Sequence, residues 1–230
     1  MNSMYDYYNY MNNLLKKCTL CPRNCNVERT ETTGKGFCKM PLSPVLARAD
    51  IHNWEEPCIS GEKGTGAIFF SGCSLKCCFC QNYPISHENK GETITTNRLV
   101  EIIKELEAKG VHTIDFVNPT HFSQVIIDCL TEYKPSIPVV YNSSGYDSVE
   151  TLQKLEGLVD IYLPDLKYFR LYTSSAENEA ATIKVGTHNE SPFAKIVSLT
   201  PAVRKTENKI EPIKNEKLST LIFVPATGGL

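Results

Sequence analysis

The chain has 230 residues, of which 41% are hydrophobic and 22% charged, enough for one core or for one core with a small appendage. Its 24 Lys and Arg against 26 Asp and Glu give a formal net charge of -2, which argues against a dedicated nucleic-acid-binding protein. The wholly apolar stretches are far shorter than the roughly 20 residues of a membrane-spanning helix, so we expect no such span. The first residues have neither the basic region nor the apolar core of a signal peptide, and we expect a cytoplasmic protein.

Cysteine is the most informative residue type, with ten in the chain. Clustered cysteines in a reducing compartment more often bind metal or carry out chemistry than form disulfides. Eight of the ten fall into two groups, Cys18/Cys21/Cys25/Cys38 and Cys73/Cys77/Cys78/Cys80. A C-x2-C pair is expected about 0.4 times by chance in such a chain, but a C-x3-C-x2-C triple only about 0.02 times. The triple Cys73, Cys77 and Cys80 is therefore a specific signal.

Residues 1–60 are predicted to form a small cysteine-rich, metal-binding segment, which begins with a Tyr- and Asn-rich leader over residues 1–13. Helical and strand periodicity are weak there, as in small knuckles where metal bonds replace a core. Four thiolates are available, and such a set favours a structural zinc site. An auxiliary iron–sulfur cluster that passes electrons is the alternative, and Cys58 could replace one of the four ligands. The four candidate ligands are Cys18, Cys21, Cys25 and Cys38.

Residues 61–169 alternate between strand and helix patterns and are predicted to form the core domain. Buried strands are predicted at 67–70, 114–117, 137–141 and 159–163. Apolar residues at helical spacing predict helices over 99–106, 122–133 and 149–155. Cys129 falls on the apolar face of the second helix and is predicted to be a packing residue. Strand–helix units at this spacing indicate right-handed crossovers, so we predict an α/β fold with a parallel sheet, open or curled into a barrel.

The loops that follow parallel strands are where such sheets carry their functional residues. This rule brings residues 72–80, 118–121, 142–146 and 165–167 to one rim, and the cysteine triple lies in the first of these loops. Three thiolates can ligate three irons of a cubic [4Fe-4S] cluster and leave the fourth iron open, whereas a structural zinc needs four protein ligands. Cys78 is poorly suited to be a fourth ligand, because adjacent residues rarely point at one centre.

The segment FSGCSLKCCFCQN, from Phe70 to Asn82, resembles the cluster loop of the radical SAM superfamily. Three further motifs resemble a subfamily of pyruvate formate-lyase activating enzymes: CPRNC at 21–25, WEEPCISG at 54–61 and YLPDLK at 162–167. Together the resemblance covers roughly residues 14–169. It implies a partial (β/α) barrel of radical SAM type.

The resemblance also implies the cofactors and the chemistry. Cys73, Cys77 and Cys80 would hold a [4Fe-4S] cluster, whose open iron chelates S-adenosylmethionine (SAM) through its amino and carboxylate groups. One electron then breaks the bond from the sulfonium to ribose C5′, and the 5′-deoxyadenosyl radical abstracts a hydrogen. In activating enzymes this hydrogen belongs to a glycine of a partner, the glycyl-radical enzyme, and a reductant such as flavodoxin or ferredoxin supplies the electron.

Three residues match family positions around SAM. Phe79 matches an apolar position whose backbone contacts adenine. Asp165 and Lys167 match an Asp-x-Lys motif near the methionyl group, where a carboxylate and an ammonium can pair with the zwitterion. A plain surface ion pair between Asp165 and Lys167 is the alternative.

The segment after the second predicted core strand departs from the pattern of activating enzymes. Those enzymes usually carry Gly-Gly-Glu there for the SAM ammonium, whereas this chain has Asn-Pro-Thr-His at 118–121. Oxygens of Asn118 and Thr120 could accept a hydrogen bond from the ammonium without supplying charge. His121 could donate a proton, but the position favours a residue at the start of a helix.

The alternation stops after residue 169, and residues 170–230 are predicted to be a divergent or truncated C-terminal region. Candidate short strands there are 183–185, 195–199 and 221–224. If the closing strands are missing, the sheet keeps an open edge. The sequence thus predicts a radical SAM enzyme that modifies a protein or a small molecule, with neither a nucleic acid nor a membrane as partner. A zinc- or cluster-binding protein without turnover is the alternative.

Overall fold

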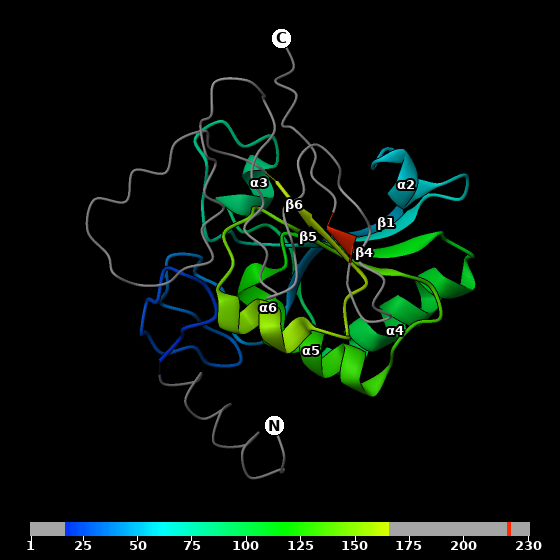
Figure 1. The fold of residues 1–230 in the computed structure, drawn as a ribbon. Coiled ribbons are helices and arrows are strands. Elements are labelled where there is room, and N and C mark those ends of the chain that lie inside the picture. Colours follow the sequence, from blue (N-terminus) through cyan, green and yellow to red (C-terminus); the bar gives the residue numbers. More distant parts are fainter. Residues whose placement is uncertain (1–16, 166–219, 222–230) are drawn as a thin grey trace, which may run out of the picture.

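A computed structural model describes residues 17–165 and 220–221. Within these residues one seven-stranded sheet, in the order β3-β1-β2-β4-β5-β6-β7, forms the centre of the molecule (Figure 1). The strands are β1 (Val45–His52), β2 (Thr65–Phe70), β3 (Glu92–Thr93), β4 (Thr113–Val117), β5 (Val139–Ser143), β6 (Ile161–Pro164) and β7 (Thr220–Leu221). The helices are α2 (Pro57–Ser60), α3 (Tyr83–Ser86), α4 (Thr96–Ala108), α5 (Ser123–Glu132) and α6 (Val149–Leu155), with a 3-10 turn η1 (Thr120–Phe122) before α5.

Most neighbouring strands run parallel. β2, β4, β5, β6 and β7 pair in parallel, whereas β1 is antiparallel to both β2 and β3. Helices α4, α5 and α6 each connect one parallel strand to the next, which makes three successive strand–helix–strand units. The predicted α/β class with a mostly parallel sheet is confirmed, and the arrangement is consistent with a partial radical SAM barrel.

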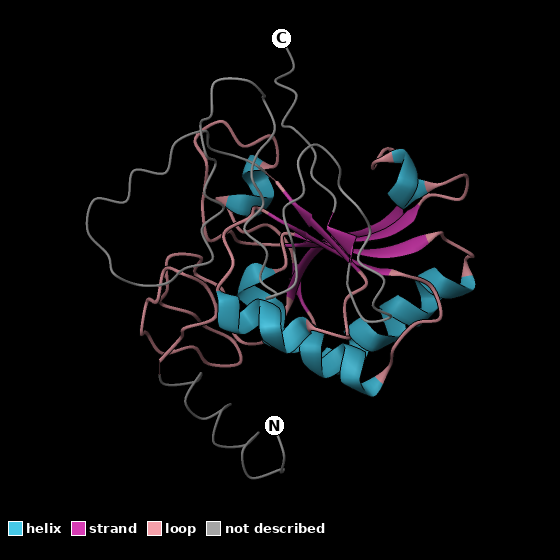
Figure 2. Ribbon diagram, in the orientation of Figure 1, coloured by secondary structure: helices cyan, strands magenta, loops and turns pink. Residues whose placement is uncertain are grey.

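Helices α4, α5 and α6 lie side by side against one face of the sheet (Figure 2). Their apolar stripes bury alternate strand residues, so that Ile68, Ile114 and Phe116 have no exposed surface. The predicted stripe residues Leu99 and Ile103 of α4 are equally buried. Cys129 is part of this core, as predicted. Among the helices that the structure describes, none is both long enough and apolar enough to cross a bilayer.

The opposite face of the sheet, called the inner face below, is covered in part by α2. Ile59 of α2 packs against Val140 and Leu163, which alternate with the residues facing the long helices. The hydroxyl of Thr113 donates to the Ile59 carbonyl at 3.0 Å and ties this short helix to β4. Asp115, two residues further along β4, also lies on the inner face and has no exposed surface. The inner face therefore mixes apolar and acidic side chains.

Strand β1 was not among the predicted elements, because the residues around it were assigned to the irregular cysteine-rich segment. It pairs with β2 from Leu46 to His52, and Val45 and Leu46 belong to the main core. The predicted division at residue 60 thus falls inside a region where one sheet and one core are continuous. The knuckle proper, residues 17–44, has turns and one isolated bridge between Arg29 and Gly34.

The four predicted core strands and three predicted helices are all present, with ends displaced by a few residues. The largest displacement of an end is at the first helix, predicted at 99–106 and found at Thr96–Ala108; the third strand, predicted at 137–141, is found at Val139–Ser143. Of the candidate strands in the tail, 183–185 and 195–199 lie outside the described residues. The third, 221–224, is represented by the two-residue strand β7, which pairs with Ile161 and Tyr162 of β6.

Candidate functional site

The loop from Ser71 to Asn82, called the cluster loop below, leaves the end of β2 at the rim of the sheet. It turns at Gly72, whose φ of 79° favours glycine. A Cβ at this position would stand 2.4 Å from the side chain of Met40, so only glycine lets the knuckle pack against the loop. The side-chain amide of Asn118, at the end of β4, donates to the Gly72 carbonyl at 2.6 Å and fixes the turn from the other side.

Within the part of the chain that the structure describes, none of the three cysteines of the triple is in a disulfide, and two of their sulfurs have a hydrogen-bond donor nearby. Cys73 is buried, and Cys77 and Cys80 are half-buried. The backbone N–H of Leu75 donates to Cys73 Sγ at 3.3 Å, and the hydroxyl of Ser86 donates to Cys80 Sγ at 3.2 Å. Donors to sulfur stabilise thiolates and tune iron–sulfur clusters. This donor set fits a cluster with one iron left open.

Two further observations concern the triple. Cys78 is exposed, whereas the three other cysteines of the loop are at least half-buried, which agrees with its exclusion as a ligand. Across residues 17–165, no three side chains of His, Cys, Asp or Glu are already grouped as a preformed metal site.

Of the expected SAM-binding residues that the structure describes, Asn118, Asp165 and Phe79 follow strands at this rim. Asn118 adopts a left-handed φ of 57°, and its N–H donates to the Asn142 carbonyl at 2.8 Å. Asp165 follows β6, where its N–H donates to the Ser143 carbonyl at 2.8 Å. Phe79, in the cluster loop, is 63% exposed. Lys167 lies outside the described residues.

Thr120 lies below the rim in a buried network. It has no exposed surface, and its hydroxyl donates to Asp147 at 2.7 Å. Tyr141 and Ser143 donate to the same carboxylate, at 3.1 and 2.6 Å. The hydroxyl of Thr120 is thus bonded to Asp147. It does not lie beside Asn118, where it was expected to accept a hydrogen bond from SAM.

His121 is also buried, in the 3-10 turn that leads into α5. Its Nε2 lies 2.6 Å from the Ser71 carbonyl at the start of the cluster loop. Burial lowers the pKa of His121 to about 3. The imidazole is therefore neutral at ordinary pH and donates from Nε2 to Ser71, a role that supports the loop.

Acidic side chains gather on the inner face. Asp115 Oδ2 accepts from the Asn142 amide at 3.3 Å, while its Oδ1 has no hydrogen-bond partner. Burial and the nearby Glu55 raise the pKa of Asp115 well above its usual value. Burial and the carboxylates of Glu56 and Asp165 raise the pKa of Glu55 to about 6. A cationic ligand bound on this face would relieve the repulsion among these groups.

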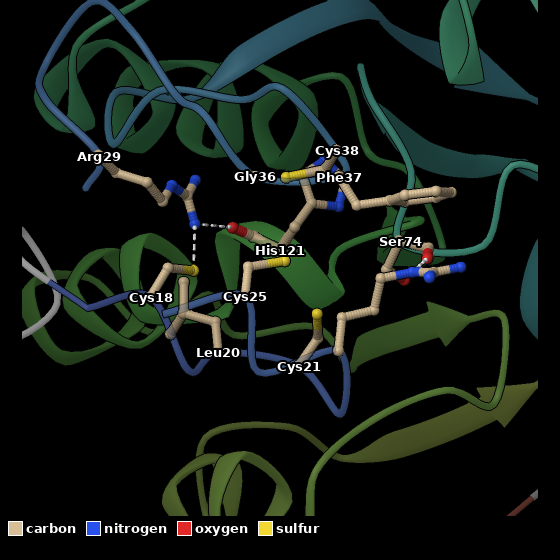
Figure 3. A pocket seen from close by; sticks show the side chains of 11 residues that line it. Cys18, Leu20, Cys21, Cys25, Arg29, Gly36, Phe37, Cys38, Ser74 and His121 are labelled. Carbon is tan, nitrogen blue, oxygen red and sulfur yellow. Dashed lines mark hydrogen bonds between the residues drawn. The ribbon is translucent and has the colours of Figure 1, made fainter. Parts of the chain in front are cut away.

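The four N-terminal cysteines line a single pocket. Figure 3 shows the side chains of Cys18, Cys21, Cys25 and Cys38 turned toward a common space. Burial raises the pKa of the Cys21 thiol to about 12, and the nearby thiol groups of the other three act in the same direction. Cys58, the expected substitute ligand, is exposed on α2 and is not among the residues that line the pocket.

Two arginines of the knuckle contact the backbone of the segments that follow β2 and β4. Arg23 Nε donates to the Ser74 carbonyl in the cluster loop at 2.5 Å, and its guanidinium lies 3.5 Å from the centre of the Phe37 ring. Arg29 donates from Nη1 to the His121 carbonyl at 2.9 Å and from Nη2 to the Pro41 carbonyl at 2.5 Å. Sequence reasoning missed both contacts. Arg23 lies within the CPRNC motif, but nothing in the sequence distinguishes Arg29 from a surface arginine.

Comparison with known proteins identifies the family. Residues 67–221 match the sequence model of the Radical SAM superfamily, and because this is more than half of the chain, the protein belongs to that superfamily. The match starts in β2, includes the cysteine triple and extends to Leu221, well into the region expected to be divergent. A relative from Methanocaldococcus jannaschii, "Uncharacterized protein MJ0674", is 35% identical over 164 residues. The aligned part is 68% of this chain and 47% of that protein, so the chain spans about half of the relative's length.

Proposed function

We propose that this protein is a radical SAM enzyme in which Cys73, Cys77 and Cys80 hold a [4Fe-4S] cluster. When bound, the cluster and SAM supply a one-electron cleavage of the sulfonium that yields a hydrogen-abstracting 5′-deoxyadenosyl radical. The observation that carries the proposal is the donor set: three cysteines after the first parallel strand, outside any disulfide within the described residues, with N–H and O–H donors near two of the sulfurs. Membership of the superfamily supports the same chemistry.

The residues around the triple have separate tasks. Asn118 and His121 hold the start of the cluster loop through Gly72 and Ser71, so the sulfurs are presented from a fixed turn. The backbone of Phe79 contacts the adenine of SAM, as its match to the family position implies. Asp165, with Lys167 two residues later, pairs with the ammonium and carboxylate of the methionyl group. We propose these contacts for SAM because the cluster loop and Asp165 follow strands β2 and β6 at one rim, and Lys167 is two residues further along the sequence.

The substrate and partners are proposed from the resemblance of the motifs. The motifs CPRNC, WEEPCISG and YLPDLK favour a glycyl-radical enzyme as substrate, from which a glycine hydrogen would be abstracted. A flavodoxin or a ferredoxin would deliver the electron. The N-terminal cysteines would hold a separate metal centre, as zinc or as an auxiliary cluster, that does not bind SAM.

The test is cleavage of SAM by protein reconstituted with iron and sulfide without oxygen. With dithionite as reductant, we expect the wild type to form 5′-deoxyadenosine, measured by liquid chromatography and mass spectrometry. Cys77→Ala should reduce product to background, because only two ligands for the cluster remain. Cys78→Ala, its exposed neighbour, is the matched control and should retain the activity. Wild-type protein that assembles the cluster but forms no 5′-deoxyadenosine would contradict the proposal and favour a binding protein without turnover.

A further inference from the structure

Four sulfurs and one buried cation meet in the N-terminal pocket. Cys18, Cys21, Cys25 and Cys38 line it, and Arg29 lines it with them (Figure 3). The guanidinium is 1% exposed, and its Nη1 points at Cys18 Sγ, 3.7 Å away. The backbone of residues 18–27 is folded around the cysteines: the N–H of Cys18 donates to the Val27 carbonyl, and the N–H of Asn26 donates back to the Cys18 carbonyl.

The buried charge of Arg29 has hydrogen-bond partners, but they are uncharged. Two backbone carbonyls accept from it, and the ion pairs within residues 17–165 do not include it. A buried cation without a countercharge is costly, so the space that it faces should carry negative charge. The groups in that space which can become anions are the four cysteine thiols.

We propose that Cys18, Cys21, Cys25 and Cys38 form a tetrathiolate zinc site, with Arg29 as its buried counter-cation. Four thiolates around Zn²⁺ carry a net charge of about -2, which the guanidinium partly balances. Binding releases the four thiol protons to solvent, and no electron is transferred. The sulfurs must close in on the ion, because the group is not preformed within the described residues.

The size of the space favours zinc over an auxiliary cluster. The cavity between the lining residues is about 10 Å³, close to the room needed by one water molecule. A cubane of four irons and four sulfides is several times larger. Gly36 closes the pocket beside Cys25, since a Cβ there would stand 3.7 Å from that sulfur. A single tetrahedral ion needs less room than a cubane, so the sulfurs can close in on it with smaller shifts of the surrounding chain.

The same site would fix the cluster loop, a role that rests on the proposed SAM chemistry. Arg23 lies between the ligands Cys21 and Cys25 and donates to the Ser74 carbonyl, next to Cys73. Arg29 holds the His121 carbonyl, while the His121 ring holds Ser71. Zinc would therefore orient two arginines that support both ends of the turn carrying the first cluster ligand. Arg23 is in this sense a positioning residue.

The first test measures bound metal in the full-length protein purified without oxygen. Mass spectrometry of metals and a sulfide assay should give about one zinc per chain that is not associated with sulfide. This zinc should persist when Cys73, Cys77 and Cys80 are all replaced by Ala. Cys21→Ser should remove it, whereas Cys58→Ser, the exposed control outside the pocket, should retain it. Iron with sulfide at the N-terminal cysteines, or no metal there, would overturn the proposal.

A second measurement does not depend on whether the cysteine variants fold. Cobalt added to the wild-type full chain freed of zinc should give the absorption bands of a tetrahedral tetrathiolate complex, and its absence would count against the site. Arg29→Met should weaken zinc binding about tenfold in competition with a chromophoric chelator. If zinc is bound as stated but the wild type forms no 5′-deoxyadenosine, the proposed function fails and the zinc site stands. If SAM is cleaved without zinc, only the zinc proposal fails.

Discussion

At the residue scale, Thr120 shows that a side chain able to bind SAM can still be used elsewhere in the fold. Its hydroxyl was expected near the SAM ammonium, but it donates to the buried carboxylate of Asp147. Thr120→Val should therefore lower the free energy of unfolding by about 1–3 kcal/mol, because Asp147 loses one of its donors. The dissociation constant for SAM should stay within about twofold of the wild type. Urea unfolding and equilibrium dialysis with SAM measure the two quantities.

Thr131→Val is the matched control for that substitution. The hydroxyl of Thr131 is exposed and donates to a carbonyl within α5, so its loss should cost under about 0.5 kcal/mol. A Thr120→Val protein of normal stability that binds SAM tenfold more weakly would show that Thr120 contacts SAM after all.

The buried carboxyl of Asp115 leads to a prediction about how the stability of the fold depends on pH. A carboxyl group whose pKa is higher in the folded than in the unfolded state contributes stability at low pH, and this is lost as pH rises above the unfolded value. The raised pKa of Asp115 therefore predicts that folding becomes less favourable between pH 5 and pH 8. In Asp115→Asn this loss should be smaller, by about 1 kcal/mol or more. Denaturant unfolding of both proteins at the two pH values gives the difference, which includes the change in the interaction between Asp115 and Glu55.

Glu55 provides a check on that reasoning. Because the pKa of Glu55 is raised from 4.5 to about 6, its contribution to stability at low pH is lost mainly between pH 4.5 and pH 6. Glu55→Gln should thus change the stability profile between pH 4.5 and pH 6, whereas the effect of Asp115→Asn should begin at the lower usual value of Asp, 3.8. Parallel profiles for Asp115→Asn and the wild type would show that the Asp115 carboxyl is ionised when buried and compensated by a cation.

At the element scale, α6 connects the knuckle to the sheet through its first turn. Ser148 is the N-cap, and its hydroxyl oxygen accepts from the Thr151 N–H at 3.3 Å. The Thr151 hydroxyl donates to the Leu20 carbonyl at 2.9 Å, beside two of the pocket cysteines. The position of the knuckle therefore depends on a helix end more than 120 residues away in the chain.

Removing two comparable N-caps distinguishes the stability lost with a cap from the stability lost with the contact between α6 and the knuckle. Thr95→Ala removes a cap from α4, where Thr95 accepts from the Arg98 N–H at 3.1 Å, and should cost about 1 kcal/mol. Ser148→Ala should cost about 0.5–1 kcal/mol more, because the support for Thr151 and its bond to Leu20 is also lost. Equal losses in thermal or urea unfolding would mean that the knuckle is not held through α6.

At the scale of the whole molecule, the spacing of apolar residues was sufficient to predict the parallel strands and the helices that connect them. Runs such as 114–117 are buried on both faces, and helical stripes such as that of α4 mark the connecting segments. The strand β1 also has a signal, since Ala47, Arg48, Ala49 and Asp50 alternate between partly buried and exposed. These residues were assigned to the irregular cysteine-rich segment because cysteines lie on both sides of them.

The parts of the site that could not be predicted depend on contacts distant in sequence. The cysteine triple could be recognised in the sequence because its three cysteines lie within eight residues of one another. In contrast, the bond from Arg23 to Ser74 joins residues 51 positions apart, and that from Arg29 to His121 joins residues 92 apart. No local pattern specifies such pairs, since they follow from how the knuckle packs on the completed sheet.

The pairing of β1 predicts how the chain tolerates N-terminal truncation. A chain of residues 61–230 lacks β1 and would leave one edge of β2 unpaired and the side of the core near Phe70 uncovered, so we expect aggregation and no cooperative unfolding. A chain of residues 44–230 keeps β1 but loses the knuckle and Met40, and should unfold cooperatively at a lower urea concentration than the full chain. Circular dichroism during urea unfolding distinguishes the three lengths. Cooperative unfolding of 61–230 would instead show that the sheet from β2 onward folds by itself and that the division at residue 60 is a true domain boundary.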